Sequence, residues 1–122
     1  MLPWTVFEGT TGRKETELRY HSSRPYGWFG LADVTGDGRP EIVLNLFNDT
    51  EDGHWHAVVL DANTGEPVCD LPRRFVQGTA DVDDDGKAEI FVASTNGVLV
   101  QTCAQIELVG LDDGKPTVRW SQ

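Results

Sequence analysis

Residues 28–44 read WFGLADVTGDGRPEIVL, and residues 76–92 read VQGTADVDDDGKAEIFV, 48 positions later and without a gap. The matching positions include an Ala-Asp-Val step, an Asp-Gly pair and a Glu-Ile pair. Self-similarity of this kind indicates one structural unit that is copied and stacked against its neighbours. With 122 residues, the chain is long enough for one domain, and we expect a single domain over residues 1–122.

Each copy of the repeat reads as four short strands separated by loops and Gly-containing turns. No stretch keeps a helical period of 3.6 residues over three turns, so no helix is expected. The third strand of the second copy is too long, which predicts an interruption near Thr102 to Gln105. The expected strands are 27–33, 41–47, 55–61 and 67–71 in the first copy, and 75–81, 88–94, 98–111 and 116–121 in the second.

Four antiparallel strands that recur every 40–50 residues or so are typical of β-propeller blades. The sequence therefore predicts an all-β fold of about two and a half four-stranded antiparallel blades. The half blade is residues 4–20, and the full blades are residues 27–71 and 75–121. Because a closed propeller needs about 4–8 blades, we expect a partial or open one. Further blades would come from a longer parent chain, which a start in mid-blade favours, or from homo-oligomerisation.

An acidic loop opens each copy, and its alternate positions carry oxygen-bearing side chains. Position 6 is glycine in both loops, where a tight turn needs freedom from a Cβ atom. The backbone carbonyl at position 7 can turn in beside the side chains. Hard oxygen ligands in a flexible ring suit Ca²⁺. The candidate ligands at positions 1, 3, 5, 7 and 9 are Asp33, Thr35, Asp37, Arg39 and Glu41 in the first loop, and Asp81, Asp83, Asp85, Lys87 and Glu89 in the second.

The alternative is that both loops are plain Asp- and Gly-rich turns facing water, with no metal. Carboxylates this close together repel one another unless a cation holds them, so we expect up to two Ca²⁺ ions, one per loop. The second loop has four acidic ligands and the stronger case, while Asp84 adds charge without ligating. The loops differ from an EF-hand because position 12 is Leu44 or Val92, where an EF-hand needs Glu.

The pair Phe29-Gly30 followed by DVTGDGRPEI, and then ADVDDDGKAEI, resembles the FG-GAP and VCBS repeat family. The second copy departs from it, with Gln77 before Gly78, and each acidic loop ends in Glu where the family usually has Asp. The resemblance covers most of residues 27–111. It implies β-propeller blades with a calcium ion in the loop between the first two strands. Members are mostly extracellular, as in integrin α-subunit heads and secreted bacterial surface proteins, so it implies an extracellular or cell-surface location.

Two groups outside the loops are weaker candidates for binding. His54 and His56 are two apart on one strand and could share a zinc or nickel ion, but no third ligand is evident; we expect them on an exposed strand edge. The other group lies before the first full blade, where aromatic residues beside an arginine could hold a sugar. Packing between blades is the favoured alternative for its aromatic residues. This second group is His21, Arg24, Tyr26 and Trp28.

Charge and composition exclude several functions. The formal net charge of −10 argues against nucleic acids and anionic membranes. No apolar run is long enough to span a membrane, and the first residues do not form a signal peptide. Cys69 and Cys103 either pair once or stay free.

No catalytic set is apparent, so we expect a non-catalytic calcium-binding module for adhesion, carbohydrate or protein recognition. The alternative is a propeller fragment of a secreted carbohydrate-active enzyme such as a polysaccharide lyase.

Overall fold

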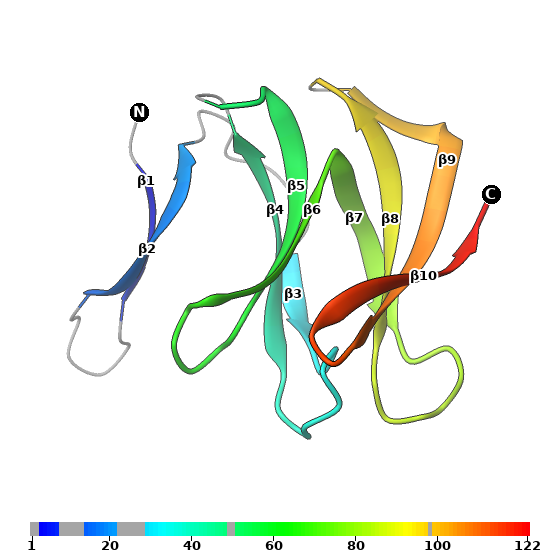
Figure 1. Ribbon diagram of the computed structural model, residues 1–122, viewed down its shortest axis with the longest axis horizontal. Coiled ribbons are helices and arrows are strands. Elements are labelled where there is room, and N and C mark those ends of the chain that lie inside the picture. Colours follow the sequence, from blue (N-terminus) through cyan, green and yellow to red (C-terminus); the bar gives the residue numbers. More distant parts are fainter. Residues whose placement is uncertain (1–2, 8–13, 22–28, 49–50, 98) are drawn as a thin grey trace.

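The structure is a computed structural model that describes residues 3–7, 14–21, 29–48, 51–97 and 99–122. These residues form ten β-strands and no helix (Figure 1). Within them, no helix is long and apolar enough to cross a membrane. The strands are β1 Pro3–Phe7, β2 Lys14–His21, β3 Phe29–Ala32, β4 Glu41–Asn48, β5 His54–Leu60, β6 Pro67–Pro72, β7 Arg74–Ala80, β8 Glu89–Asn96, β9 Leu99–Asp112 and β10 Lys115–Ser121.

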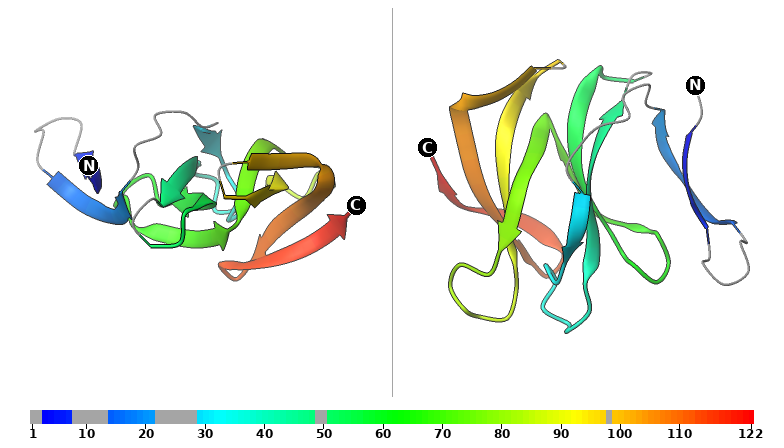
Figure 2. Two further views of the ribbon diagram at one scale, coloured as in Figure 1. Left: turned by 90° about the horizontal axis from the view of Figure 1, so that it is seen from above. Right: turned by 180° about the vertical axis from the view of Figure 1, so that it is seen from behind.

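Two four-stranded antiparallel sheets and one hairpin make up the fold. The first sheet has the order β3-β4-β5-β6, the second has the order β7-β8-β9-β10, and β1 pairs with β2. The hairpin, the first sheet and the second sheet follow one another along the molecule (Figures 1 and 2). The predicted all-β class and the paired four-stranded units are therefore confirmed. The described strands form no closed ring.

The long strand β9 contains the interruption that the sequence predicts. Ala93 of β8 pairs with Ile106, but the next residue, Ser94, pairs with Gln101. Residues 102–105 therefore have no partner on β8, as in an enlarged β-bulge. The ends of the eight strands in the two sheets lie within two residues of the predicted ends. The turn residues and the alternation of apolar side chains thus locate these strands well.

The main hydrophobic core lies between the two sheets. Alternate residues of a strand point to opposite faces, and each sheet turns one row of aliphatic side chains toward the other. All ten of the core side chains are at most 7% exposed. From the first repeat they are Val34, Val43, Ala57, Val59 and Cys69, and from the second they are Val76, Ile90, Val92, Val109 and Leu111.

Polar and aromatic contacts also connect the two sheets. The Asn45 side chain lies beside the backbone of Val76: its Oδ1 accepts from the Val76 N–H at 2.7 Å, and its Nδ2 donates to the Val76 carbonyl at 3.4 Å. Trp55 contacts Phe47 and Phe75 edge-on, with ring centroids 5.4 and 4.9 Å away. Asn45 is 6% exposed, so its two hydrogen bonds to the Val76 backbone satisfy polar groups that would otherwise be buried without a partner.

The first sheet is also buried on its other face. Leu46, Val58 and Leu60 form a second core cluster there, with Ile42 and Leu44 packed against it. The hairpin lies on this side, since β2 contacts β4. This second face is therefore covered around β4 and β5, whereas Leu31 on β3 is 67% exposed, and β10, at the edge of the second sheet, is exposed along its whole length.

Candidate metal centres

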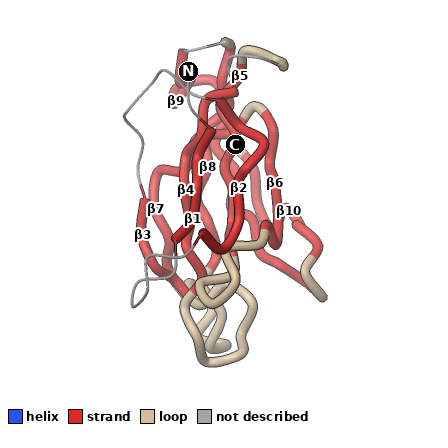
Figure 3. Tube along the Cα trace, turned by 90° about the vertical axis from the view of Figure 1, so that its left-hand side faces the viewer, coloured by secondary structure: helices blue, strands red, loops and turns tan. Residues whose placement is uncertain are grey.

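The two acidic loops lie at the same end of the molecule. Residues 33–40 connect β3 to β4, and residues 81–88 connect β7 to β8. Both loops project from the lower end of the sheets in Figure 1, and the loops at this end gather together in Figure 3. The repeat thus places equivalent loops at equivalent ends of two packed sheets.

The first loop is wrapped around the carboxylate of Glu41, the first residue of β4. Glu41 Oε2 accepts from the backbone N–H groups of Val34 and Thr35 at 2.9 and 3.2 Å, and its Oε1 accepts from the Thr35 hydroxyl at 3.1 Å. Asp33 accepts from the N–H groups of Gly36 and Gly38, both at 2.8 Å. Carboxylate oxygens of Asp33, Asp37 and Glu41 lie within 4.8 Å of one another.

The second loop repeats this arrangement, again with a cluster of three carboxylates. Glu89 Oε2 accepts from the Val82 N–H at 3.0 Å. Asp81 accepts from the N–H groups of Asp85 and Gly86 at 3.1 and 2.9 Å. Carboxylate oxygens of Asp81, Asp83 and Glu89 lie within 4.8 Å of one another. Three convergent carboxylates at this spacing can hold one hard divalent cation.

The two glutamates that begin β4 and β8 are buried. Glu41 is 4% exposed and Glu89 is 1% exposed, yet neither forms an ion pair with a Lys, Arg or His among the described residues. The nearby Lys87 instead donates to the Leu111 carbonyl and pairs with Asp112 at 3.7 Å. Because an uncompensated buried charge is costly, a bound cation would fit both positions.

Desolvation, hydrogen bonds and neighbouring charges shift the pKa values of Asp81 and Asp83 in the second loop in opposite directions. Desolvation raises the pKa of Asp83, and the hydrogen bond to Asp85 and the charges of Asp85 and Glu89 raise it further. Desolvation acts in the same direction on Asp81, but the backbone N–H groups around that carboxyl outweigh it and lower its pKa. Asp81 thus favours the ionised form, whereas the Asp85 N–H that bonds to Asp83 does not outweigh the effects that raise the pKa of Asp83.

The two loops contact each other. The Ala88 N–H donates to the Asp33 carbonyl at 2.7 Å, which joins the residue before Glu89 to a member of the other cluster. The Lys87 side chain lies over Gly36, where a Cβ atom would come within 2.5 Å of it. Gly36 also has a φ of 84°, in the region that only glycine adopts readily. A larger residue at position 36 would therefore strain the turn and displace Lys87.

The predicted ligand sets are brought together only in part. Thr35 donates its hydroxyl to Glu41, so it supports that carboxylate. Asp85 accepts from the Lys87 N–H at 2.8 Å and is not among the three carboxylates that converge in its loop. The carbonyls of Arg39 and Lys87 stay predicted ligands. Asp84 is exposed and also lies outside the cluster.

The expectation that His54 and His56 lie on an exposed strand edge is wrong. Strand β5 is an interior strand of its sheet, and His56 is only 4% exposed. Its Nδ1 contacts Asp70 and its Nε2 contacts Asp52, each at 2.7 Å. His54 instead accepts from the Gly97 N–H at 3.2 Å. The two rings have separate partners, and His56 is a structural histidine whose partners the sequence does not make obvious.

Folding stability is expected to fall as the pH rises through the folded pKa of His56. Burial lowers this pKa, but the hydrogen bonds and charges of Asp70 and Asp52 outweigh burial and raise it above 6.5. The protonated ring therefore stabilises the fold fully below the unfolded pKa, and this contribution is lost at higher pH. Thermal unfolding between pH 6 and 9 measures the slope. His56→Gln should flatten it and His54→Gln should not; equal slopes in both variants would contradict this role.

The remaining predicted binding residues lie largely outside the described part of the chain. Arg24, Tyr26 and Trp28 fall within residues 22–28, and of His21 only the backbone, at the end of β2, is described.

Cys69 is a buried free thiol. Burial, and then the charge of Asp70, raise its pKa to about 11, so the thiol is neutral and unreactive at physiological pH.

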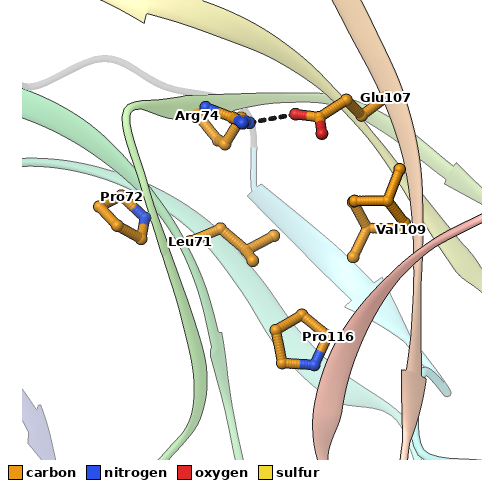
Figure 4. A pocket seen from close by; sticks show the side chains of 7 residues that line it. Leu71, Pro72, Arg74, Glu107, Val109 and Pro116 are labelled. Atoms are coloured by element: carbon orange, nitrogen blue, oxygen red, sulfur yellow. Dashed lines mark hydrogen bonds and ion pairs between the residues drawn. The ribbon is translucent and has the colours of Figure 1, made fainter. Parts of the chain in front are cut away.

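A groove lies between the outer strands of the two sheets, β6 and β10 (Figure 4). It encloses about 280 Å³, and Arg74 and Glu107 form an ion pair at one end. Its walls are otherwise apolar. The lining residues are Leu71, Pro72, Arg74, Glu107, Val109, Pro116 and Val118.

Comparisons with protein-family models, curated proteins and solved structures found no match to this chain. The fold and the loops by themselves define an all-β protein of two packed four-stranded sheets, each with a cluster of acidic groups that could bind a metal.

Proposed function

We propose that this chain is a calcium-binding β-propeller repeat module, similar to FG-GAP and VCBS repeats, in which each acidic loop holds one Ca²⁺. The observation that carries the proposal is the pair of buried glutamates, Glu41 and Glu89, that lie beside further carboxylates and form no ion pair with a basic side chain in the part of the chain that the structure describes. Oxygen-only ligands favour Ca²⁺ over softer metals such as zinc. The ions would hold the loops in place and thereby stabilise the stacked sheets.

The role that follows is structural or binding, with no catalytic chemistry. The sheets would act as blades of a larger propeller, beside further blades of the same kind, and the assembled surface would recognise a carbohydrate or a protein. An extracellular or cell-surface location agrees with calcium use, because extracellular modules bind calcium at about 10⁻⁴–10⁻³ M, where it is abundant. A fragment of a carbohydrate-active enzyme is the alternative, but its candidate residues lie mostly within 22–28, outside the described residues.

Calorimetric titration with calcium chloride tests the proposal directly. The wild-type chain is expected to bind two Ca²⁺ ions. The double variants Asp33→Asn/Asp37→Asn and Asp81→Asn/Asp83→Asn should each bind only one, because Asn removes the charge. Asn keeps only one of the two oxygens with which Asp33 and Asp81 accept from backbone N–H groups, so circular dichroism has to show that each variant is folded. No uptake by the folded wild-type chain would refute the calcium site.

Asp84→Asn is a matched control within the second loop. Its side chain lies outside the cluster, and its backbone φ of 61° is one that Asn tolerates. The variant removes a loop charge without removing a candidate ligand, so it should retain two bound ions. If it lost an ion as the cluster variants do, calcium would be attracted by diffuse negative charge and not by a defined site.

A further inference from the structure

The contact between the two sheets is built on one row of residues that crosses the first sheet. Cross-strand pairing joins Gly30 to Val43, Val43 to Val59, and Val59 to Cys69. Val43, Val59 and Cys69 are 0%, 1% and 7% exposed and belong to the core between the sheets. We call these four residues the docking row. The second sheet covers it with the aliphatic face of β8 and β9.

The second sheet carries an equivalent row at its far side. Pairing joins Gly78 to Phe91, Phe91 to Leu108, and Leu108 to Trp120, strand for strand as in the docking row. We call these four residues the terminal row. Trp120 is 46% exposed, and Phe91 and Leu108 are half-buried. Larger apolar side chains are thus left accessible at positions whose counterparts in the first sheet are fully covered.

The terminal row faces away from the first sheet. Ile90, Val92 and Val109 lie in the core between the sheets, and neighbouring residues of a strand point to opposite faces. Phe91 and Leu108 therefore point outward, at the end of the molecule opposite the β1–β2 hairpin (Figures 1 and 2).

The direction of stacking indicates what would cover this row. The first sheet turns its docking row toward the second sheet and its other aliphatic face, around Leu46, Val58 and Leu60, toward the hairpin. The contact is therefore head-to-tail, because two different faces meet. Continued in the same direction, the terminal row of one chain would meet the hairpin end of another. Such heterologous contacts build rings or open stacks.

We propose that the terminal row is a docking surface for the β1–β2 end of a second copy of this chain. The argument is continuity with the internal sheet-to-sheet contact, and it does not depend on calcium. Burial of Phe91, Leu108 and Trp120 supplies apolar area at the centre of the contact, where aromatic residues contribute most. The net charge of −10 opposes self-association, so higher salt should strengthen it by screening.

Light scattering after size exclusion, across the micromolar range and in calcium-free buffer, tests the proposal. The wild-type mass is expected to rise with concentration above that of one chain. Trp120→Glu should raise the dissociation constant at least about tenfold. Val118→Glu is the matched control: Val118 is 52% exposed on the same strand but pairs with Val109 and lines the groove on the other face. It should leave the mass unchanged.

Mixing variants establishes the head-to-tail mode. A chain with Trp4→Glu, or with Leu18→Glu as a second choice if the first does not fold, carries a charge in the hairpin. Each hairpin variant is expected to be monomeric alone, and so is Trp120→Glu. An equimolar mixture of Trp120→Glu with a hairpin variant should form a dimer, because the first chain keeps its hairpin and the second keeps its terminal row. A monomeric wild type throughout, equal losses in Trp120→Glu and Val118→Glu, or no rescue on mixing would overturn the proposal.

Discussion

Calcium at about 10 mM, a hundredfold excess over a Kd of about 10⁻⁴ M, is expected to raise the thermal unfolding midpoint of this protein by roughly 10 °C per occupied loop, and EDTA should reverse the shift. A ligand that binds only the folded state at a hundredfold excess over its Kd stabilises it by about 2.7 kcal/mol. For a domain of this size, 1 kcal/mol corresponds to roughly 4 °C. Differential scanning calorimetry with calcium, with EDTA and with magnesium measures the effect. Magnesium should do less, because it demands a stricter octahedral geometry.

Glu89→Gln distinguishes a metal site from an ordinary turn, because its effect on folding stability should depend on calcium. Without calcium, the variant loses an uncompensated charge that is 1% exposed, while its amide oxygen can still accept from the Val82 N–H. It should therefore be as stable as the wild type, or more so. With calcium, it should lose most of the stabilisation from the second loop, since a ligand charge is gone.

Glu66→Gln is the control for this experiment, because Glu66 is an exposed acid in the turn between β5 and β6. It should follow the wild type in both buffers. A Glu89→Gln protein that is destabilised equally with and without calcium would mean that Glu89 acts only through its hydrogen bond to Val82. The loop would then be a plain turn.

Local patterns in the sequence are enough to locate the strands of both sheets and the acidic loops. Glycine at positions 38 and 86, with φ of 84° and 88°, marks turns that the chain can make in few other ways. Apolar alternation gives the strands between the turns. Even the interruption in β9 follows from a strand that is too long to pair throughout with β8.

Contacts between distant segments are what the sequence does not reveal. The sequence predicts an exposed strand edge for His56 because Asp52 and Gly53 precede it. The pairing of β5 with both β4 and β6 instead places His56 inside the sheet. Its partner Asp70 comes from the neighbouring strand. Only the spacing of four residues between Asp52 and His56 hints at their contact across the turn. The bond from Ala88 to Asp33, which joins the two loops, leaves no signal in either loop alone.

The individual ligands show the same limit. The loop spacing predicts that Asp85 points inward, yet its carboxylate accepts from the Lys87 N–H instead. A side chain two residues before a backbone donor can form this local bond at little cost. Residue type and spacing thus identify the cluster but not each of its members, since Asp37 accepts from the Arg39 N–H at 2.8 Å in the same way and still lies in the first cluster.

Ile90→Ala is expected to lower the free energy of unfolding by about 3 kcal/mol, since truncating a buried isoleucine typically costs 2–5 kcal/mol or so. Ile90 is 1% exposed in the core between the two sheets, and its neighbours there come from both repeats. The shorter truncation Ile90→Val should cost about 1 kcal/mol. Urea unfolding monitored by tryptophan fluorescence gives both values, and an unchanged slope would show that the two sheets still unfold together.

Val118→Ala tests whether this loss reflects the core between the sheets or only reduced strand propensity. Val118 is 52% exposed on β10, so its truncation should change stability by no more than about 0.5 kcal/mol. If Ile90→Ala cost as little as Val118→Ala, the two sheets would not be packed through Ile90. If two separate transitions appeared, the sheets would fold as independent units, and the shared core would not be what makes the two repeats one domain.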